Sequence, residues 1–128
     1  MLFVCVGNAG RSQMAEAFFN QAAGGKTMAI SAGTRPASAV DPRTIEVMRE
    51  VGIDISRNKP KALTMEMLEQ ADRVITMGCR AEGVCPASFV ETEDWQLEDP
   101  KGKPIEEVRR IRDEIRARVL SMLEKSKP

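Results

Sequence analysis

Short apolar runs alternate with stretches of helical periodicity along the chain. The run Leu2–Val6 predicts a buried strand. Met28–Ile30 and Arg73–Met77 predict two further strands, and Ala87–Val90 is a candidate for a short fourth. The polar stretch 91–104 that follows lacks such a pattern and is expected to be irregular.

Four segments between and after these runs have the pattern of helices. They cover Arg11 to about Ala23, Asp41 to near Gly52, a short stretch from Thr64, and Ile105 to about Lys125. The apolar positions of the last helix are Val108, Ile111, Ile115, Val119, Leu120 and Leu123. Asp41 stands directly before Pro42, which is typical of an N-cap followed by proline at the first helical position.

The order of these elements, β-α-β-α-α-β-β-α, predicts the fold class. It is typical of an α/β protein in which parallel strands form the centre and helices cover both faces of the sheet. The 128 residues fit one domain. We therefore expect residues 1–128 to form a single-domain, three-layer α/β/α structure around a four-stranded parallel sheet.

Composition and charge narrow the classes of function. Lysine plus arginine and aspartate plus glutamate both number 19, so nothing suggests a general attraction to nucleic acid or to a membrane surface. No apolar run is long enough to span a bilayer, and the apolar start lacks a basic leader, so we expect a soluble, cytoplasmic protein. The three cysteines are an odd number, which speaks against a disulfide framework. The absence of histidine excludes cysteine–histidine and serine–histidine catalysis and histidine-bound metals.

The turn between the first strand and the first helix is the strongest candidate for a functional site. Cys5 stands at the carboxyl end of the strand, where parallel sheets bind ligands. Glycines and asparagine in the turn tolerate positive φ, so backbone N–H groups can turn inward and form an anion-binding nest. The helix N-terminus and the forked guanidinium of Arg11 add positive charge. The expected oxyanion-binding residues are Val6, Gly7, Asn8, Ala9, Gly10, Arg11 and Ser12.

The positive environment of this loop favours the thiolate of Cys5, to which Ser12 could donate a hydrogen bond. One loop would then bind a tetrahedral oxyanion and present a nucleophile beneath it. The alternative is that Cys5 is a buried strand cysteine and Arg11 a solvated helix residue.

The string from Cys5 to Ser12 resembles the Cys-x5-Arg-Ser loop of the low-molecular-weight protein tyrosine phosphatases. Its continuation to Ala17 is similar to the thioredoxin-coupled arsenate reductases that share this fold. Three further segments also resemble that family, namely Ser31–Gly33, Val51–Ser56 and Arg109–Ile115. The resemblance covers almost the whole chain. It implies an arsenate reductase that takes arsenate as substrate, with phosphate or sulfate as competing oxyanions, and that needs no cofactor.

The resemblance also implies a relay of the three cysteines. Cys5 attacks arsenate, Cys79 attacks the Cys5 sulfur as arsenite leaves, and Cys85 then attacks Cys79. The resulting Cys79–Cys85 disulfide is reduced by thioredoxin or a similar dithiol protein. The alternatives are that Cys79 and Cys85 are buried packing residues, or zinc ligands, for which three cysteines without histidine are a weak signal.

The predicted fold places two constraints on such a relay. In the predicted sheet the third strand neighbours the first, and adjacent strands are only ~4.8 Å apart, so Cys79 is expected on the same sheet edge as Cys5. A regular helix over residues 79–85 would separate the two Cα atoms by ~9 Å. A disulfide needs Cα atoms within ~7 Å. The segment is therefore expected to be a loop or to unwind during turnover.

The leaving oxygen must be protonated, and with histidine absent a carboxylic acid is the natural proton donor. Asp99, directly before Pro100, matches the general acid of the resembling family. Glu98 is a rival, and an Asp-Pro pair is also a common turn. Trp95 could shield the pocket or simply pack in the core.

Some members of the resembling family bind potassium behind the anion loop, through residues that match Asn8, Glu16 and Ser31. Lys61 stands where a further acidic ligand would fall. We hypothesise that Lys61 pairs with Glu16 in place of the ion, so that no metal is bound. The alternative is that Lys61 is a solvated linker charge.

Two enzymatic functions and one binding function remain open on the sequence alone. The first is arsenate reduction through Cys5, Cys79 and Cys85. The second is a low-molecular-weight phosphatase that hydrolyses phosphoesters and needs only Cys5, Arg11 and Asp99; the chain has no tyrosine to hold an aryl phosphate. The third is an oxyanion sensor or redox-regulated binding protein.

Overall fold

The computed structural model describes residues 1–77 and 92–125. Within them the elements are β1 (Leu2–Cys5), α1 (Arg11–Ala23), β2 (Ile30–Gly33), α2 (Pro42–Glu50), α3 (Met65–Gln70), β3 (Val74–Thr76), β4 (Thr92–Asp94) and α4 (Ile105–Lys125). Their order is the one that the sequence predicts. None of the described helices is long and apolar enough to cross a membrane.

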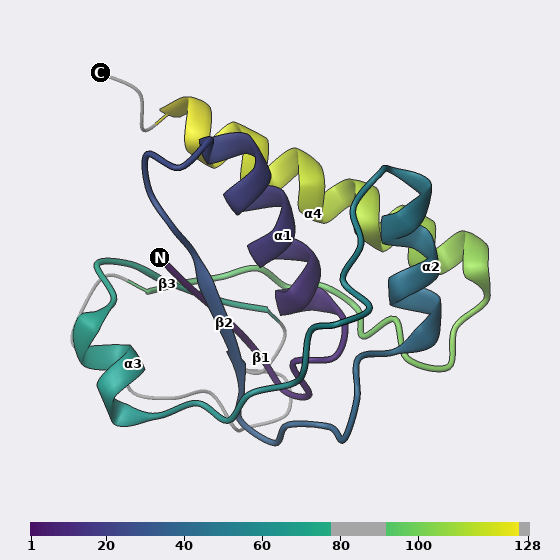
Figure 1. The fold of residues 1–128 in the computed structure, drawn as a ribbon, viewed down its shortest axis with the longest axis horizontal. Coiled ribbons are helices and arrows are strands. Elements are labelled where there is room, and N and C mark those ends of the chain that lie inside the picture. Colours follow the sequence, from purple (N-terminus) through teal and green to yellow (C-terminus); the bar gives the residue numbers. More distant parts are fainter. Residues whose placement is uncertain (78–91, 126–128) are drawn as a thin grey trace.

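The strands form a parallel sheet in the order β2-β1-β3-β4 (Figure 1). In β1, Val4 is the register partner of Ala32 on one side and of Thr76 on the other. The expectation that the third strand lies beside the first is thereby confirmed. The carboxyl ends of β1, β2 and β3 consequently meet at one edge of the sheet.

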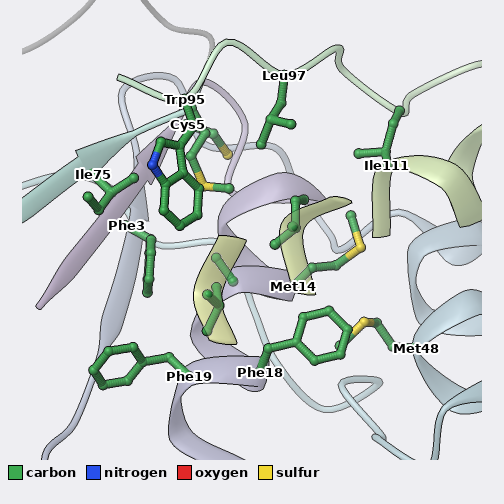
Figure 2. Close-up of a cluster of buried hydrophobic side chains, with 14 of the residues drawn as sticks. Phe3, Cys5, Met14, Phe18, Phe19, Met48, Ile75, Trp95, Leu97 and Ile111 are labelled. Carbon is green, nitrogen blue, oxygen red and sulfur yellow. The ribbon is translucent and has the colours of Figure 1, made fainter. Parts of the chain in front are cut away.

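Successive residues of a strand point to opposite faces, and the two faces of this sheet have separate cores. Phe3 and Cys5 face α1, α2 and α4, where Phe3 packs edge-on against Phe19 with ring centroids 6.0 Å apart (Figure 2). Leu2 and Val4 face the opposite way, into a smaller cluster beneath α3. In Figure 1, α3 lies on the opposite side of the sheet from α1, α2 and α4. The predicted three-layer α/β/α arrangement is confirmed.

Helix ends follow local signals in the sequence. Asp41 caps α2, since its side chain accepts a hydrogen bond from the Arg43 N–H at 3.0 Å and Pro42 opens the helix. Gly24 ends α1 in the left-handed conformation, with φ of 60°. The long helix α4 spans the predicted range, although Leu120, which was expected on its apolar stripe, is 43% exposed.

Strand boundaries follow the sequence pattern less well. The second strand begins at Ile30 and runs to Gly33, not over Met28–Ile30, because β1 offers backbone partners only to that range. Met28 is 70% exposed. The predicted strand Ala87–Val90 lies outside the described residues.

The stretch 91–104 was expected to be irregular, and residues 95–104 indeed form no helix or strand. The prediction is wrong for Thr92–Asp94, which form β4. This strand has no apolar alternation, and it forms because β3 supplies its backbone partners. The Thr76 hydroxyl also donates a hydrogen bond to the Asp94 carboxylate at 2.6 Å. Cross-strand polar pairs of this kind stabilise a sheet without an apolar pattern.

We expect Ile115→Ala to lower the free energy of unfolding by about 2–5 kcal/mol, because Ile115 is fully buried on the face of α4 that packs into the larger core. Leu120→Ala on the same helix is the matched control and should cost about 0.5 kcal/mol, as for other exposed positions. Urea denaturation measures both. Equal losses for the two variants would contradict the assignment of the buried face of α4.

Candidate active site

The loop between β1 and α1 is held by backbone hydrogen bonds from the connection between β2 and α2. The carbonyls of Cys5 and Val6 accept from the N–H groups of Thr34 and Arg35, at 3.1 and 2.8 Å. The carbonyls of Gly7 and Ala9 accept in the same way from Ala37 and Asp41, at 2.9 and 3.0 Å. Four loop carbonyls are thus engaged on one side of the loop.

This arrangement fixes the direction of the loop N–H groups. A trans peptide places each N–H opposite the preceding carbonyl, so the amides that follow these carbonyls point to the other side. The Asn8 N–H lies on that side and donates to the Cys5 sulfur at 3.2 Å. The loop therefore has the form of a nest of N–H groups that can hold an anion over Cys5.

Asn8, one of the residues expected to tolerate positive φ in this turn, is the one that adopts it. Of the loop residues, Asn8 has positive φ, at 51°, whereas Gly10 has φ of −144°. Gly10 is needed for space instead, since a Cβ there would lie 2.9 Å from Cγ of Pro100. Gly33 has the same role, because its Cβ would lie 2.7 Å from the Val6 carbonyl oxygen. Both glycines allow neighbouring segments to pack directly on the anion loop.

The Cys5 thiol is buried at the base of this loop. Its sulfur lies 2.9 Å from the Ser12 hydroxyl, in addition to the Asn8 N–H. The Asn8 side-chain amide in turn donates to the Ser12 hydroxyl at 2.7 Å. Cys5 is thus placed at the base of the loop with polar groups around its sulfur.

Arg11 and Asp99 reach the site from different parts of the chain. The Arg11 side chain is only 4% exposed; one guanidinium nitrogen donates to the Leu97 carbonyl at 3.2 Å, and another lies 3.8 Å from the Asp99 carboxylate. The Asp99 side chain is 52% exposed, so it can exchange protons with solvent. The Arg11 contacts thus tie the segment that carries Asp99 to the anion loop.

A pocket of about 710 Å³ opens above these residues. Cys5, Arg11 and Asp99 line it, together with Arg35, Arg43 and Lys101. The cations on its wall suit a negatively charged ligand. None of the described residues that line the pocket is aromatic.

Glu98, the other candidate acid, and Trp95, the candidate for shielding the pocket, do not line the pocket. The Glu98 carboxylate pairs with Lys103 at 3.3 Å and with Arg110 at 3.5 Å, and Glu98 does not line the pocket. Trp95 is buried against Phe3, with ring centroids 5.9 Å apart. Of the two carboxylates considered, only Asp99 is placed to act on a ligand, and Trp95 packs in the core.

Cys79 and Cys85 lie outside the described residues. The first described segment, residues 1–77, ends beside Cys5, however, because the Met77 N–H donates to the Val4 carbonyl at 2.7 Å.

Sequence reasoning missed Arg35 and Arg43 on the pocket wall and the fully buried Gln13 behind the loop. The sequence carried no local signal for Gln13, because its burial depends on contacts with Asn58 and Lys59, which lie far from it in the chain.

Lys61 and Glu16 lie together behind the anion loop, with the ammonium 3.9 Å from the carboxylate. Burial raises the pKa of Glu16, and the neighbouring Lys61 ammonium opposes this rise only in part. The Asn8 carbonyl oxygen already accepts from the Lys61 N–H at 2.9 Å and from Gln13 at 3.1 Å. These residues do not fit a potassium ion, because an ammonium lies beside the carboxylate and the Asn8 oxygen is occupied.

We expect replacement of sodium by potassium at constant ionic strength to leave the rate of arsenate reduction unchanged. Lys61→Asp is the informative comparison, since it removes the ammonium and adds an oxygen ligand, and its turnover should rise with potassium. Stimulation of the unmodified protein by potassium would contradict the replacement of the ion by Lys61.

Comparisons with known proteins agree with this geometry. The model of the family described as low molecular weight phosphotyrosine protein phosphatase matches residues 1–127. An arsenate reductase of Bacillus cereus is 42% identical over 119 residues, which are 91% of this chain and 88% of that protein.

Two solved structures are similar over nearly the whole chain. The thioredoxin-dependent arsenate reductase of Corynebacterium glutamicum has a TM-score of 0.81 at 39% identity, and the match covers 97% of this chain and 59% of that one. The low molecular weight protein tyrosine phosphatase of T. tengcongensis has a TM-score of 0.83 at 31% identity, with 97% of each chain covered. The chain belongs to the low molecular weight phosphotyrosine protein phosphatase family.

Proposed function

We propose that this protein reduces arsenate to arsenite, with Cys5 as the nucleophile and Cys79 and Cys85 as the thiols that complete the electron transfer. The observation that carries the proposal is the position of β3, whose carboxyl end lies beside that of β1. The Met77 N–H donates a hydrogen bond to the Val4 carbonyl there, and Cys79 follows Met77 by two residues in the sequence. The identity to relatives named arsenate reductase supports the same reaction.

The first step is the attack of the Cys5 thiolate on arsenic. Arsenate is a tetrahedral oxyanion, which the N–H groups of residues 6–12 and the Arg11 guanidinium bind; phosphate or sulfate compete because their shape and charge are similar. A sulfur–arsenic bond forms, and one arsenate oxygen leaves as water after Asp99 donates a proton.

The remaining steps transfer two electrons from sulfur to arsenic. The Cys79 thiolate attacks the Cys5 sulfur, the sulfur–arsenic bond breaks, and its electron pair reduces arsenic(V) to arsenic(III), which leaves as arsenite. The Cys5–Cys79 disulfide that results is then attacked by the Cys85 thiolate, which frees Cys5 and leaves a Cys79–Cys85 disulfide. Thioredoxin or a similar dithiol reduces that bond, and we place the reaction in the cytoplasm, where such reductants keep thiols reduced.

Phosphoester hydrolysis is the second candidate function, because Cys5, Arg11 and Asp99 alone would support it and they meet in one pocket. In that reaction water, not a second sulfur, would resolve the covalent adduct. The pocket wall has cations but no aromatic side chain among the described residues, so it offers little surface to an aryl group. We therefore expect hydrolysis of aryl phosphates to be slow.

The relay predicts different defects for the two downstream cysteines. Cys79→Ser should abolish release of arsenite, and Cys85→Ser should stop after a single turnover with a Cys5–Cys79 disulfide. Both variants should keep their rate of phosphoester hydrolysis, whereas Cys5→Ser should lose both reactions. The measurement is arsenite release with thioredoxin and p-nitrophenyl phosphate hydrolysis, side by side.

The outcome also decides between the two functions. Full arsenate reduction by both Cys79→Ser and Cys85→Ser would contradict the relay. Robust hydrolysis by the unmodified protein with no reduction of arsenate would establish the phosphatase instead.

We expect Asp99→Asn to lower kcat for arsenate reduction roughly a hundredfold, because an amide cannot supply the proton for the leaving oxygen. Glu98→Gln is the matched control, since its carboxylate is paired with Lys103 and Arg110 away from the pocket, and it should retain its rate. Rates at several pH values measure both. Equal losses in the two variants would show that the defect is not one of proton donation from Asp99.

A further inference from the structure

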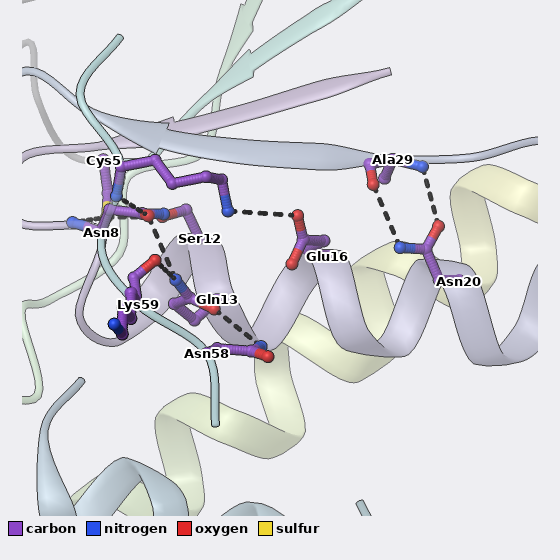
Figure 3. A network of polar contacts seen from close by, with 10 residues as sticks. Cys5, Asn8, Ser12, Gln13, Glu16, Asn20, Ala29, Asn58 and Lys59 are labelled. Atoms are coloured by element: carbon purple, nitrogen blue, oxygen red, sulfur yellow. Dashed lines mark hydrogen bonds and ion pairs between the residues drawn. The ribbon is translucent and has the colours of Figure 1, made fainter. Parts of the chain in front are cut away.

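Gln13 is a fully buried polar side chain of α1 that the proposed reaction does not use. It lies behind the anion loop, between Asn8 and the segment 58–61 (Figure 3). Its amide nitrogen donates to the Asn8 carbonyl oxygen at 3.1 Å and to the Lys59 carbonyl at 3.4 Å. Its amide oxygen accepts from the Asn58 side chain at 3.1 Å. All of its hydrogen-bonding groups are thus engaged inside the protein.

Backbone groups fix the orientation of this amide. The Lys59 carbonyl can only accept a hydrogen bond, so it must face the Gln13 nitrogen. The Gln13 oxygen then faces Asn58, whose amide donates to it. Gln13 therefore presents a donor, and not an acceptor, to Asn8.

The same reasoning extends from Asn8 to the nucleophile. The Lys61 N–H can only donate, so the atom of Asn8 that it contacts at 2.9 Å must be the oxygen, which also receives the Gln13 donor. The Asn8 nitrogen consequently faces the Ser12 hydroxyl, which accepts at 2.7 Å. Because the Ser12 oxygen accepts there, its own proton is free to be donated to the Cys5 sulfur 2.9 Å away.

We propose that Gln13 is a positioning residue that sets the direction of this hydrogen-bond chain, so that Ser12 donates to the Cys5 thiolate. Gln13 also supplies one of the two bonds that hold the Asn8 oxygen while the Asn8 backbone has a φ of 51°. A chain of aligned donors and acceptors stabilises the charged group at its end more than isolated bonds would. The proposal rests on Cys5 as the nucleophile of the proposed function, but not on the identity of the oxyanion.

Asn20 provides a matched control on the same helix. It lies seven residues after Gln13 on the same face of α1 and makes two hydrogen bonds to the backbone of Ala29, at 2.8 and 3.1 Å (Figure 3). These bonds tether α1 but do not connect to Cys5. Loss of stability in general should therefore appear in both Gln13 and Asn20 variants, and a change at the thiolate only in Gln13 variants.

The test is the pH dependence of alkylation of Cys5 by iodoacetamide, followed on the Cys5 peptide by mass spectrometry in the full chain with all cysteines present. Gln13→Met keeps the side-chain volume and removes the bonds. We expect its half-maximal rate to move to higher pH and its rate below that pH to fall roughly three- to tenfold. Asn20→Leu should keep the profile of the unmodified protein.

A second variant covers the case in which Gln13→Met does not fold. Asn58→Asp changes an exposed residue and offers only acceptors to Gln13, which favours the reversed amide and places an oxygen against Asn8. Its profile should move in the same direction by a smaller amount, at a salt concentration that screens the added charge.

Unchanged alkylation profiles in the folded Gln13 and Asn58 variants would overturn the proposal, and so would an equal displacement in Asn20→Leu. The assay contains no arsenate and no reductant. If the Gln13 variant shows a displaced alkylation profile but the unmodified protein does not reduce arsenate, the role of Gln13 is supported and the proposed function is contradicted. If the unmodified protein reduces arsenate but the Gln13 variant keeps its profile, the proposed function stands and the role of Gln13 is overturned.

Discussion

Hydrogen bonds from the backbone of residues 34–41 to the carbonyls of Cys5, Val6, Gly7 and Ala9 fix the direction of the peptide groups in the loop between β1 and α1. With these carbonyls held on one side of the loop, the N–H groups that follow them must point to the other side. Without the bonds, carbonyl oxygens could turn to that second side and repel an anion. The bonds form because β2 pairs with β1, so that both strands end at the same edge and their connections run together. The anion site is thus a direct consequence of the parallel register.

A second layer behind the loop keeps this arrangement rigid. Asn8 has the left-handed backbone conformation, which costs free energy in a residue other than glycine, and the bonds from Lys61 and Gln13 to its side chain offset that cost. Glu16 and Lys61 bring opposite charges together at the rim of the same layer. A site that is ordered before the oxyanion arrives does not lose binding energy to reorganisation.

The pocket separates two kinds of residue by exposure. Cys5 and Arg11 are buried, so in the proposed reaction the sulfur and the guanidinium would act on the oxyanion in a medium where charge interactions are strong. Asp99 is half-exposed at the mouth, where a proton can be replaced from solvent after each cycle. The same two-part site would serve hydrolysis or reduction, and the thiols that follow β3 are what distinguish the two proposed outcomes.

Local chemistry in the sequence determined the helix ends, the type of loop after the first strand and, through the missing histidine, the kind of acid required. Asp41, Pro42 and Gly24 act within a few residues, so their effect is readable without the fold. Tertiary structure alone decided the rest. It made a strand of Thr92–Asp94 through pairing with β3, and it placed Asp99 but not Glu98 on the wall of the pocket. It also requires Gly10 and Gly33 for close packing. It also joined Gln13 to Lys59, because contacts between residues distant in sequence depend on how the elements pack, which no local pattern records.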